Sequence, residues 1–450
     1  MKRTPALVSL IVALAVTAAG LLIPSAAGAT RGGTSHSSGY ATPTTKGAHW
    51  VNTWAAMPQL TESSNMPPAP FTQSNRVFEN ATLRQTVHVT VGGRYTRIRL
   101  SNAFGGTNLP VTSASVALPA DGKAGVSAIV PASARPVTFD GQPGIDIPKA
   151  AQAVSDPLDL EVKPGTNLTV TLYLATGQAS TSITSHPGSR TTSYMLAGNH
   201  LDDADLTGAT AVDHWYFLSG IEAWSKSGTA AAVMLGDSLT DGRGSTTNMN
   251  NRWPDQLLAR LQSRPATSGI AILNQAAGGN CVLRDCLGPS ALSRVDRDVL
   301  AQSGVSWLFV FSGVNDIGGA GTTDSATKKV TADLVTGYQQ IITRAHAQGI
   351  RVYGATLTPF GGNGYDDATA AHEAARQAVN DWIRTSGRFD AVVDFDRAVR
   401  DPQNPRLLSP AYDVGDHLHL NPTGYQALAD AVPAGLLKHT PIASAFPTTN

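Results

Sequence analysis

Ser238, His419 and Asp416 are the residues whose types and spacing could carry out nucleophilic chemistry. Ser238 lies in GDSLTDGRG (236–244), directly after an apolar run, and a serine hydroxyl becomes a nucleophile only when a base takes its proton. His419 and Asp416 share the stretch DVGDHLHLNPTGY (413–425). Their three-residue spacing lets the carboxylate reach imidazole Nδ1 and leaves Nε2 free to accept the serine proton. The three side chains therefore predict acyl transfer by an activated serine.

Other interpretations of the same stretches stay open at this point. A Gly-Asp-Ser sequence is also common turn chemistry, and Asn421 with Pro422 would suit the start of a helix in an ordinary polar loop. His417 is an alternative base and Asp413 an alternative carboxylate. Because adjacent side chains tend to diverge, we favour Asp416 with His419.

Two further stretches could supply donors for an oxyanion. Asn315 follows an apolar run in FVFSGVNDIGG (309–319), and Gly279 follows another in LNQAAGGNC (273–281). A neutral amide and a backbone N–H at strand ends can hydrogen-bond a developing negative charge. Each stretch could also be a turn that needs glycine or asparagine for its backbone.

The elements that would position these residues alternate between strand and helix. Five short apolar runs begin near residues 231, 270, 306, 351 and 391, and amphipathic helical patterns at 325–349 and 367–387 end at glycines. Such alternation predicts a parallel sheet covered by helices on both faces. Ligands of such sheets bind at the carboxyl ends of the strands, where Ser238 lies. The loop at 356–362 leaves the fourth strand at the same edge and is expected to line the pocket.

The chain before this region has a different pattern. Residues 48–225 contain short runs that alternate apolar and polar residues, separated by turn clusters such as ADGKAG and DGQPG. This pattern predicts an all-β sandwich or jelly roll. We expect five segments in total: a signal peptide (1–29), a flexible linker (30–47), the all-β domain (48–225), an α/β domain (228–437) and a C-terminal tail (438–450).

Four stretches of the α/β region resemble the sequence blocks of the SGNH (GDSL) hydrolase family. GDSL matches the first block, GGN (278–280) the second, GVND (313–316) the third and DHLH (416–419) the fourth, in the family's order. The resemblance covers roughly residues 228–437. It implies a three-layer α/β/α, flavodoxin-like sandwich with about five parallel strands, here preceded by a β-rich domain.

The same resemblance implies a role for each residue. Ser238 would be the nucleophile, His419 the base and Asp416 the group that orients it. The backbone N–H groups of Ser238 and Gly279 and the side chain of Asn315 would form the oxyanion hole. The chemistry needs neither a metal nor an organic cofactor.

The N-terminus and the cysteines indicate an exported protein. Lys2 and Arg3 precede an apolar stretch (6–23) and a small-residue cleavage site, the layout of a secretory signal. Cys281 and Cys286 are the only two cysteines, and a close pair in an exported chain predicts a local disulfide. We therefore expect an extracellular protein without stable membrane insertion once the signal is removed.

Composition excludes several classes of partner. The chain has a formal net charge of +0 and 15% charged residues, so it lacks the basic surface typical of nucleic-acid binding. The sequence does not specify an oligomeric state.

We predict a secreted serine esterase that acts on a small-molecule or polymer ester, including acetyl groups of polysaccharides. The alternatives are a lipid acylhydrolase of the lipase or phospholipase type, and a carbohydrate-binding cell-wall protein with an inert hydrolase-like domain.

Overall fold

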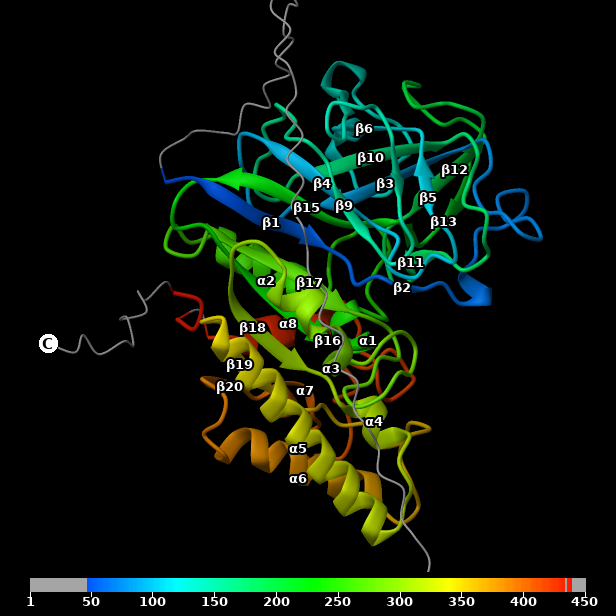
Figure 1. The fold of residues 1–450 in the computed structure, drawn as a ribbon. Helices are drawn as coiled ribbons and strands as arrows, with labels where there is room; N and C mark the ends of the chain where they lie inside the picture. The colour runs from blue at the N-terminus through cyan, green and yellow to red at the C-terminus, as the bar shows by residue number, and fades with distance from the viewer. Residues whose placement is uncertain (1–46, 434, 439–450) are drawn as a thin grey trace, which may run out of the picture. The chain divides into compact units, whose positions relative to one another are not determined.

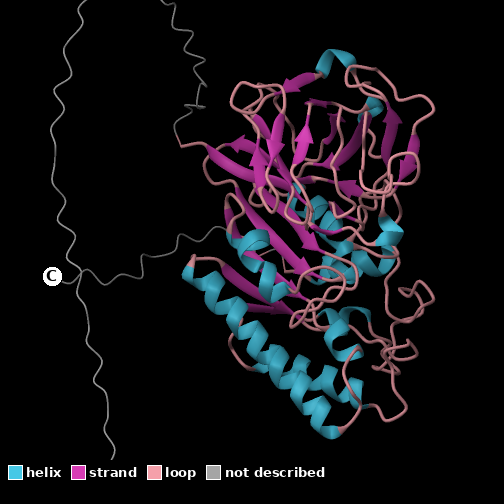
Figure 2. Ribbon diagram, turned by 45° about the vertical axis from the view of Figure 1, so that its right-hand side comes forward, coloured by secondary structure: helices cyan, strands magenta, loops and turns pink. Residues whose placement is uncertain are grey.

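The computed structural model describes residues 47–433 and 435–438. Strands and loops make up almost all of its first half, whereas strands alternate with helices in the second (Figure 2). We call these the β-rich part (His49–Ser225) and the α/β part (Ala230–Leu437). The expected signal peptide, nearly all of the expected linker and residues 439–450 lie outside the described residues. The segment boundaries given above remain predictions.

The β-rich part contains fifteen strands and three short 3₁₀ helices among the described residues. They are β1 (His49–Ala55), β2 (Gln59–Leu60), η1 (Ser63–Asn65), β3 (Ala81–His88), β4 (Thr96–Ser101), β5 (Leu109–Val111), β6 (Ser113–Ala117), η2 (Ala120–Gly122), η3 (Pro131–Ser133), β7 (Arg135–Val137), β8 (Ile145–Ile147), β9 (Gln152–Val154), β10 (Asn167–Leu174), β11 (Thr184–His186), β12 (Ser193–Ala197), β13 (Thr210–Val212), β14 (Trp215–Tyr216) and β15 (Leu218–Ser225).

These strands form antiparallel sheets, which confirms the prediction of an all-β first part. One sheet has the order β1-β15-β4-β9 and another the order β13-β12-β3-β10-β6-β7, with smaller sheets β14-β11-β2 and β5-β8. Alternating apolar side chains of these strands, such as Leu83, Val87, Leu168 and Leu172, share one buried core. Burial of such side chains is the main term that stabilises a sheet of this kind.

The α/β part begins with β16 and contains the predicted alternation. Its elements are β16 (Ala230–Gly236), α1 (Ser238–Asp241), α2 (Trp253–Gln262), β17 (Ile270–Ala276), α3 (Ala291–Val295), the π-helix η4 (Asp296–Leu300), β18 (Val305–Phe311), α4 (Val314–Gly318), α5 (Asp324–Ala347), β19 (Arg351–Ala355), α6 (Ala371–Thr385), β20 (Ala391–Val393), α7 (Phe395–Val399) and α8 (Pro422–Ala431).

The five strands of this part form one parallel sheet in the order β17-β16-β18-β19-β20, which Figure 1 shows with its flanking helices. Helix α2 packs on α8, and α5 packs on α6. The arrangement is the predicted three-layer, flavodoxin-like sandwich. In this order β16 lies between β17 and β18. The chain passes from β16 to β17 on one side of β16, and β18 lies on its other side. The resulting crevice at the carboxyl ends of β16 and β18 is where such folds bind ligands.

The β-rich part covers the edge strand of the parallel sheet. Strand β1 packs against β17, and the backbone N–H of Ile272 donates to Thr90 Oγ1 at 3.2 Å. Val51 and Val91 of the β-rich part are buried in the same core as the parallel strands. An uncovered edge strand presents unpaired backbone groups to other chains. The contact therefore stabilises the sheet and protects its edge.

A buried arginine joins the ends of two parallel strands. Arg294 of α3 donates from Nη1 to the carbonyl of Gln275 at 2.6 Å and from Nη2 to the carbonyl of Gly236 at 3.2 Å. Its guanidinium also contacts Asn280 Oδ1 at 2.9 Å and forms an ion pair of 3.2 Å with the buried carboxylate of Asp298. Arg294 thereby satisfies carbonyl groups at the strand ends, which buried backbone requires.

We expect Arg294→Met to lower the free energy of unfolding by about 3–5 kcal/mol, because two buried backbone carbonyls, the Asn280 side chain and the buried Asp298 carboxylate each lose a donor. Denaturant unfolding followed by circular dichroism would measure the loss. The control is Arg397→Met on α7, which removes a 69% exposed partner of Asp394 and should cost about 1 kcal/mol or less. Equal losses for the two variants would contradict the role assigned to Arg294.

Candidate active site

Ser238 is the first residue of α1, directly beyond the end of β16. The Asp237 side chain caps this short helix by accepting the N–H of Leu239 at 3.1 Å. Gly236 lets the turn pass close to the next strand, since a Cβ there would lie 2.8 Å from the carbonyl oxygen of Phe311. The Gly-Asp-Ser stretch is thus a tight strand-to-helix turn that lifts the serine to the sheet edge.

Ser238 and His419 come together although 181 positions separate them in the chain. Ser238 Oγ lies 2.8 Å from His419 Nε2, and His419 Nδ1 lies 2.7 Å from Asp416 Oδ2. The other oxygen of Asp416 accepts the backbone N–H of His419 at 2.8 Å. Since Nδ1 faces a carboxylate it carries the proton, and Nε2 is left to accept from the serine hydroxyl.

The alternative base and the alternative carboxylate pair with each other. His417 Nδ1 lies 2.7 Å from Asp413 Oδ2, and the His417 side chain is 54% exposed. His417 has a φ of 62°, which turns it away from its neighbour His419. The loop therefore holds two His–Asp pairs, and the pair favoured from the sequence is the one beside Ser238.

The surroundings of His419 favour its neutral form. Burial lowers the pKa of His419 below its ordinary value, and the nearby Arg243 and Arg190 act in the same direction. Asp416 opposes them by hydrogen bonding and charge. Burial acts to raise the pKa of Asp416, but hydrogen bonds from the backbone and ring of His419 hold it below its ordinary value. A charged carboxylate beside a neutral imidazole suits a general base.

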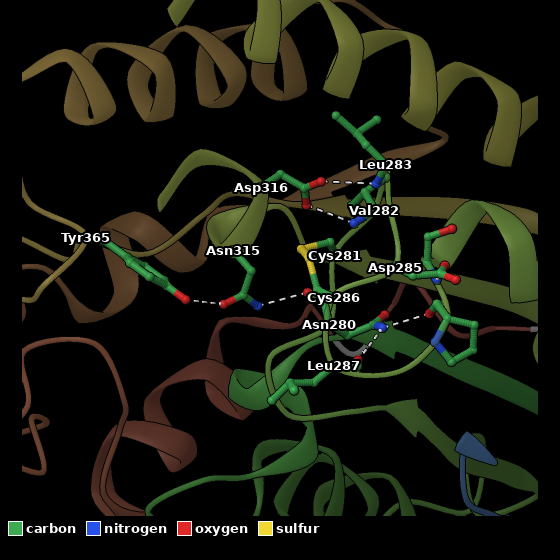
Figure 3. The surroundings of a disulfide bond; sticks show 12 residues. Asn280, Cys281, Val282, Leu283, Asp285, Cys286, Leu287, Asn315, Asp316 and Tyr365 are labelled. Carbon is green, nitrogen blue, oxygen red and sulfur yellow. Dashed lines mark hydrogen bonds between the residues drawn. A yellow bond between two sulfur atoms is a disulfide. The ribbon is translucent and has the colours of Figure 1, made fainter. Parts of the chain in front are cut away.

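Asn315 is held in one orientation by two hydrogen bonds, which Figure 3 shows. Its Nδ2 donates to the carbonyl of Asn280 at 2.8 Å, and its Oδ1 accepts from the Tyr365 hydroxyl at 2.8 Å. An amide nitrogen has two hydrogens, so the second one is available for another acceptor. Burial raises the pKa of Tyr365, which keeps its hydroxyl protonated as a donor.

The predicted disulfide lies beside this amide. Cys281 and Cys286 are joined in a disulfide bond (Figure 3), and the loop they close begins two residues after Gly279. The carboxylate of Asp316 accepts the N–H groups of Val282 at 2.8 Å and Leu283 at 3.0 Å. The disulfide loop and the strand end that carries Asn315 are therefore fixed to each other.

A cleft of about 530 Å³ brings the predicted residues together. Ser238, Gly279, Asn315 and His419 all line it, whereas Asp416 lies behind His419. Its volume is in the range of typical small-molecule sites. Residues 356–362, expected to line the pocket, do not line it, and Tyr365 does so instead.

The β-rich part also lines this cleft. Glu62 follows β2 and Arg190 follows β11, and both line it together with Asp241 of α1. No local motif marks these residues, because their position depends on how the β-rich part packs on the α/β part. In residues 186–190, Gly188 is the local signal, and a glycine there predicts only a turn.

The model of the GDSL-like lipase/acylhydrolase family matches residues 234–427. These residues form a GDSL-like lipase/acylhydrolase domain. We call them the hydrolase domain below. No curated protein matches the chain.

Several solved structures are similar to this chain. An acetylxylan esterase from Geobacillus stearothermophilus, Axe2, is 19% identical, with 45% of this chain and 91% of that chain covered and a TM-score of 0.34. The acetyl xylan esterase AlAXEase is 20% identical, with coverages of 45% and 96% and a TM-score of 0.35. A GDSL-like lipase from Bacteroides thetaiotaomicron is 16% identical, with coverages of 45% and 85% and a TM-score of 0.33.

Among the described residues, no helix combines the length and apolar character that crossing a membrane requires.

The pKa of His419 should lie below 6.5, because burial opposes the charged imidazolium. Titration of its ring signals by NMR would measure this value. Asp416→Asn should lower the pKa further, since it removes a negative charge that stabilises the imidazolium. As a control, Asp381→Asn on the exposed face of α6 should leave the titration unchanged. A pKa above 6.5, or a rise in Asp416→Asn, would contradict the electrostatic account.

Proposed function

We propose that this protein is a serine ester hydrolase in which Ser238, His419 and Asp416 form the catalytic triad. The observation that supports the proposal best is the continuous hydrogen-bond chain from Ser238 Oγ to His419 and on to Asp416. Such a chain activates a serine wherever it occurs, independently of fold. The match of residues 234–427 to an acylhydrolase family adds to it.

In the proposed reaction, Ser238 Oγ attacks the ester carbonyl carbon while His419 Nε2 takes its proton. The carbonyl oxygen becomes an oxyanion, which the backbone N–H groups of Ser238 and Gly279 and the Asn315 amide stabilise. When the C–O bond to the alcohol breaks, His419 returns the proton to the leaving oxygen. Water then attacks the acyl-enzyme with His419 again as base, and releases the acid and the free serine.

The character of the cleft favours a polar alcohol over a lipid. Glu62, Arg190, Asp241 and Arg243 bring charged side chains to its lining. A lipid-binding cleft would instead be lined mostly by apolar side chains. We therefore propose carbohydrate esters, including acetylated polysaccharides, ahead of lipid esters. The disulfide and the N-terminal sequence pattern support a secreted protein.

The carbohydrate-binding alternative would need exposed aromatic side chains, and the stretches HWVNTW (49–54) and DHWYF (213–217) are the candidates. Trp54 and Trp215 contact each other edge to face, with ring centroids 4.8 Å apart, and both are nearly inaccessible to solvent. Tyr216 and Phe217 are also buried. These rings pack in the core of the β-rich part and are not exposed for stacking on sugars, whereas Trp50 of the first stretch is half-buried and packs edge to face on Trp224.

Ser238→Ala should abolish hydrolysis of p-nitrophenyl acetate while the thermal unfolding midpoint stays near that of the unchanged protein. The substitution removes the hydroxyl that forms the acyl-enzyme and leaves the fold intact. The matched control is Ser245→Ala, which removes a hydroxyl that donates only to the local carbonyl of Gly242. Full activity in Ser238→Ala, or an unchanged protein without activity on a panel of esters, would refute the proposed function.

Tyr365→Phe should lower kcat about tenfold with little change in KM, because the Asn315 amide loses the bond that sets its orientation. The effect should be smaller than the roughly 10²–10³ expected for Asn315→Ala, which removes the donor itself. Steady-state kinetics on one short ester would measure both. Tyr173→Phe is a close control. The Tyr173 hydroxyl also donates to an asparagine side chain, at 2.9 Å from Asn80 Oδ1, but it lies away from the cleft. An unchanged kcat in Tyr365→Phe would remove Tyr365 from the oxyanion site.

A further inference from the structure

The cleft contains a carboxylate that neither the triad nor the oxyanion hole uses. Asp241 is the last residue of α1, one helical turn from Ser238, and both residues line the cleft. Its side chain is 1% exposed. Oδ1 contacts His186 Nε2 at 3.0 Å, whereas Oδ2 has no hydrogen-bond partner among the described residues. A buried carboxylate oxygen without a donor is costly and needs an explanation.

Arg190, in the β-rich part, is the charged side chain that forms an ion pair with this oxygen. Arg190 Nη2 lies 3.8 Å from Asp241 Oδ2, which is too long for a hydrogen bond. Arg190 Nε is buried and has no hydrogen-bond partner in the described structure either. Both residues line the cleft, and each has a buried polar atom with unused hydrogen-bonding capacity.

Asp241 is in its charged form. Burial acts to raise its pKa, but the His186 ring and the guanidinium groups of Arg190 and Arg252 hold the pKa below its ordinary value. The His186 imidazole is held in place by its second nitrogen, which contacts the carbonyl of Met57 at 3.0 Å. Two side chains of the β-rich part therefore keep an ionised carboxylate next to the nucleophile.

The chain from His186 to Arg190 fits closely against this carboxylate. A Cβ on Gly188 would lie 1.8 Å from Asp241 Oδ2, so no other residue type fits there without a shift. The segment brings Arg190 to the cleft by passing within contact distance of α1. Close fit of this kind between two parts of the chain indicates a built arrangement and not a chance approach of surface side chains.

A second carboxylate on the same wall is also fixed in place. Glu62 accepts from Asn65 Nδ2 at 2.9 Å and from the Gln59 amide. Asn65 is in turn held by the Tyr216 hydroxyl, which donates to its carbonyl at 2.8 Å. Glu62, Gln59 and Asn65 all line the cleft. The β-rich wall therefore offers oriented hydrogen-bond acceptors and donors beyond Arg190.

We propose that Arg190 and Asp241 form a subsite that binds hydroxyl groups of a carbohydrate alcohol beside the reacting ester. A sugar hydroxyl can both donate and accept a hydrogen bond. It can therefore donate to Asp241 Oδ2 and accept from the Arg190 guanidinium. In this way the hydroxyl would bridge two groups that are too far apart to bond to each other directly. The β-rich part would thus determine specificity for the alcohol. This inference rests on the proposed ester hydrolysis.

The test compares two acetate esters that differ in the alcohol. Arg190→Met should lower kcat/KM for acetylated xylotetraose about tenfold, mainly through KM, because hydrogen bonds to a charged group are lost. The ratio of this kcat/KM to that for p-nitrophenyl acetate, whose alcohol has no hydroxyl to bind, should fall several-fold, and taking the ratio cancels the effect that loss of Arg190 has on the pKa of His419 for both esters. Arg76→Met, on the exposed surface of the β-rich part and away from the cleft lining, is the matched control and should change neither.

A second measurement does not depend on turnover of the sugar ester. Unmodified xylotetraose should inhibit p-nitrophenyl acetate hydrolysis competitively, and its inhibition constant should rise about tenfold in Arg190→Met and in Asp241→Asn. Equal loss on both esters, no loss on either, or inhibition unaffected by both substitutions would overturn the subsite. An unchanged protein that fails to hydrolyse p-nitrophenyl acetate would instead overturn the proposed function itself.

Discussion

The guanidinium of Arg294 supplies donors to backbone carbonyls where two parallel strands stop, and the geometry of the candidate active site depends on that bond set. At the carboxyl end of a parallel sheet the last carbonyls have no N–H of a neighbouring strand from which to accept a hydrogen bond, and burying them is costly unless another donor reaches them. Arg294 joins the ends of β16 and β17 and contacts Asn280 Oδ1. The carbonyl of Asn280 in turn accepts from Asn315 at the end of β18. Three strand ends that contribute to the site are thereby fixed by one connected set of hydrogen bonds.

The local sequence was sufficient to predict much of this. Apolar runs of strand length with helical patterns between them predicted the number of the parallel strands and their positions in the chain, because strands buried on both faces consist of continuous apolar runs. The spacing of Asp416 and His419 predicted the pair that lies beside Ser238, and the structure shows why Asp413 and His417 are not that pair: they bond to each other at the exposed end of the loop. The short separation of Cys281 and Cys286 predicted their disulfide. All of these features depend on residues near one another in the chain or on the regular rule that parallel strands end at one edge.

What the sequence could not indicate depends on contacts between distant segments. Arg190 and Asp241 are 51 positions apart, and no pattern in either stretch predicts that a strand end of the β-rich part reaches the nucleophile helix. Tyr365 lies just after the loop 356–362, which was expected to line the pocket. Only the folded path of the chain shows that Tyr365, and not a residue of that loop, contacts Asn315. Trp54 and Trp215 show the same limit. The sequence is compatible both with a sugar-binding surface and with a buried core at these positions, and only their burial in the folded chain distinguishes the two.

The packing of β1 against β17 has a consequence for how this chain could be divided. Because Val51 and Val91 belong to the core of the parallel sheet, the two parts do not behave as interchangeable modules joined by a spacer. A fragment that began at β16 would leave the apolar flank of β17 open to self-association. Transplanting the α/β part into another protein would therefore require carrying β1 and the segment around Val91 with it, or redesigning that flank as a polar surface.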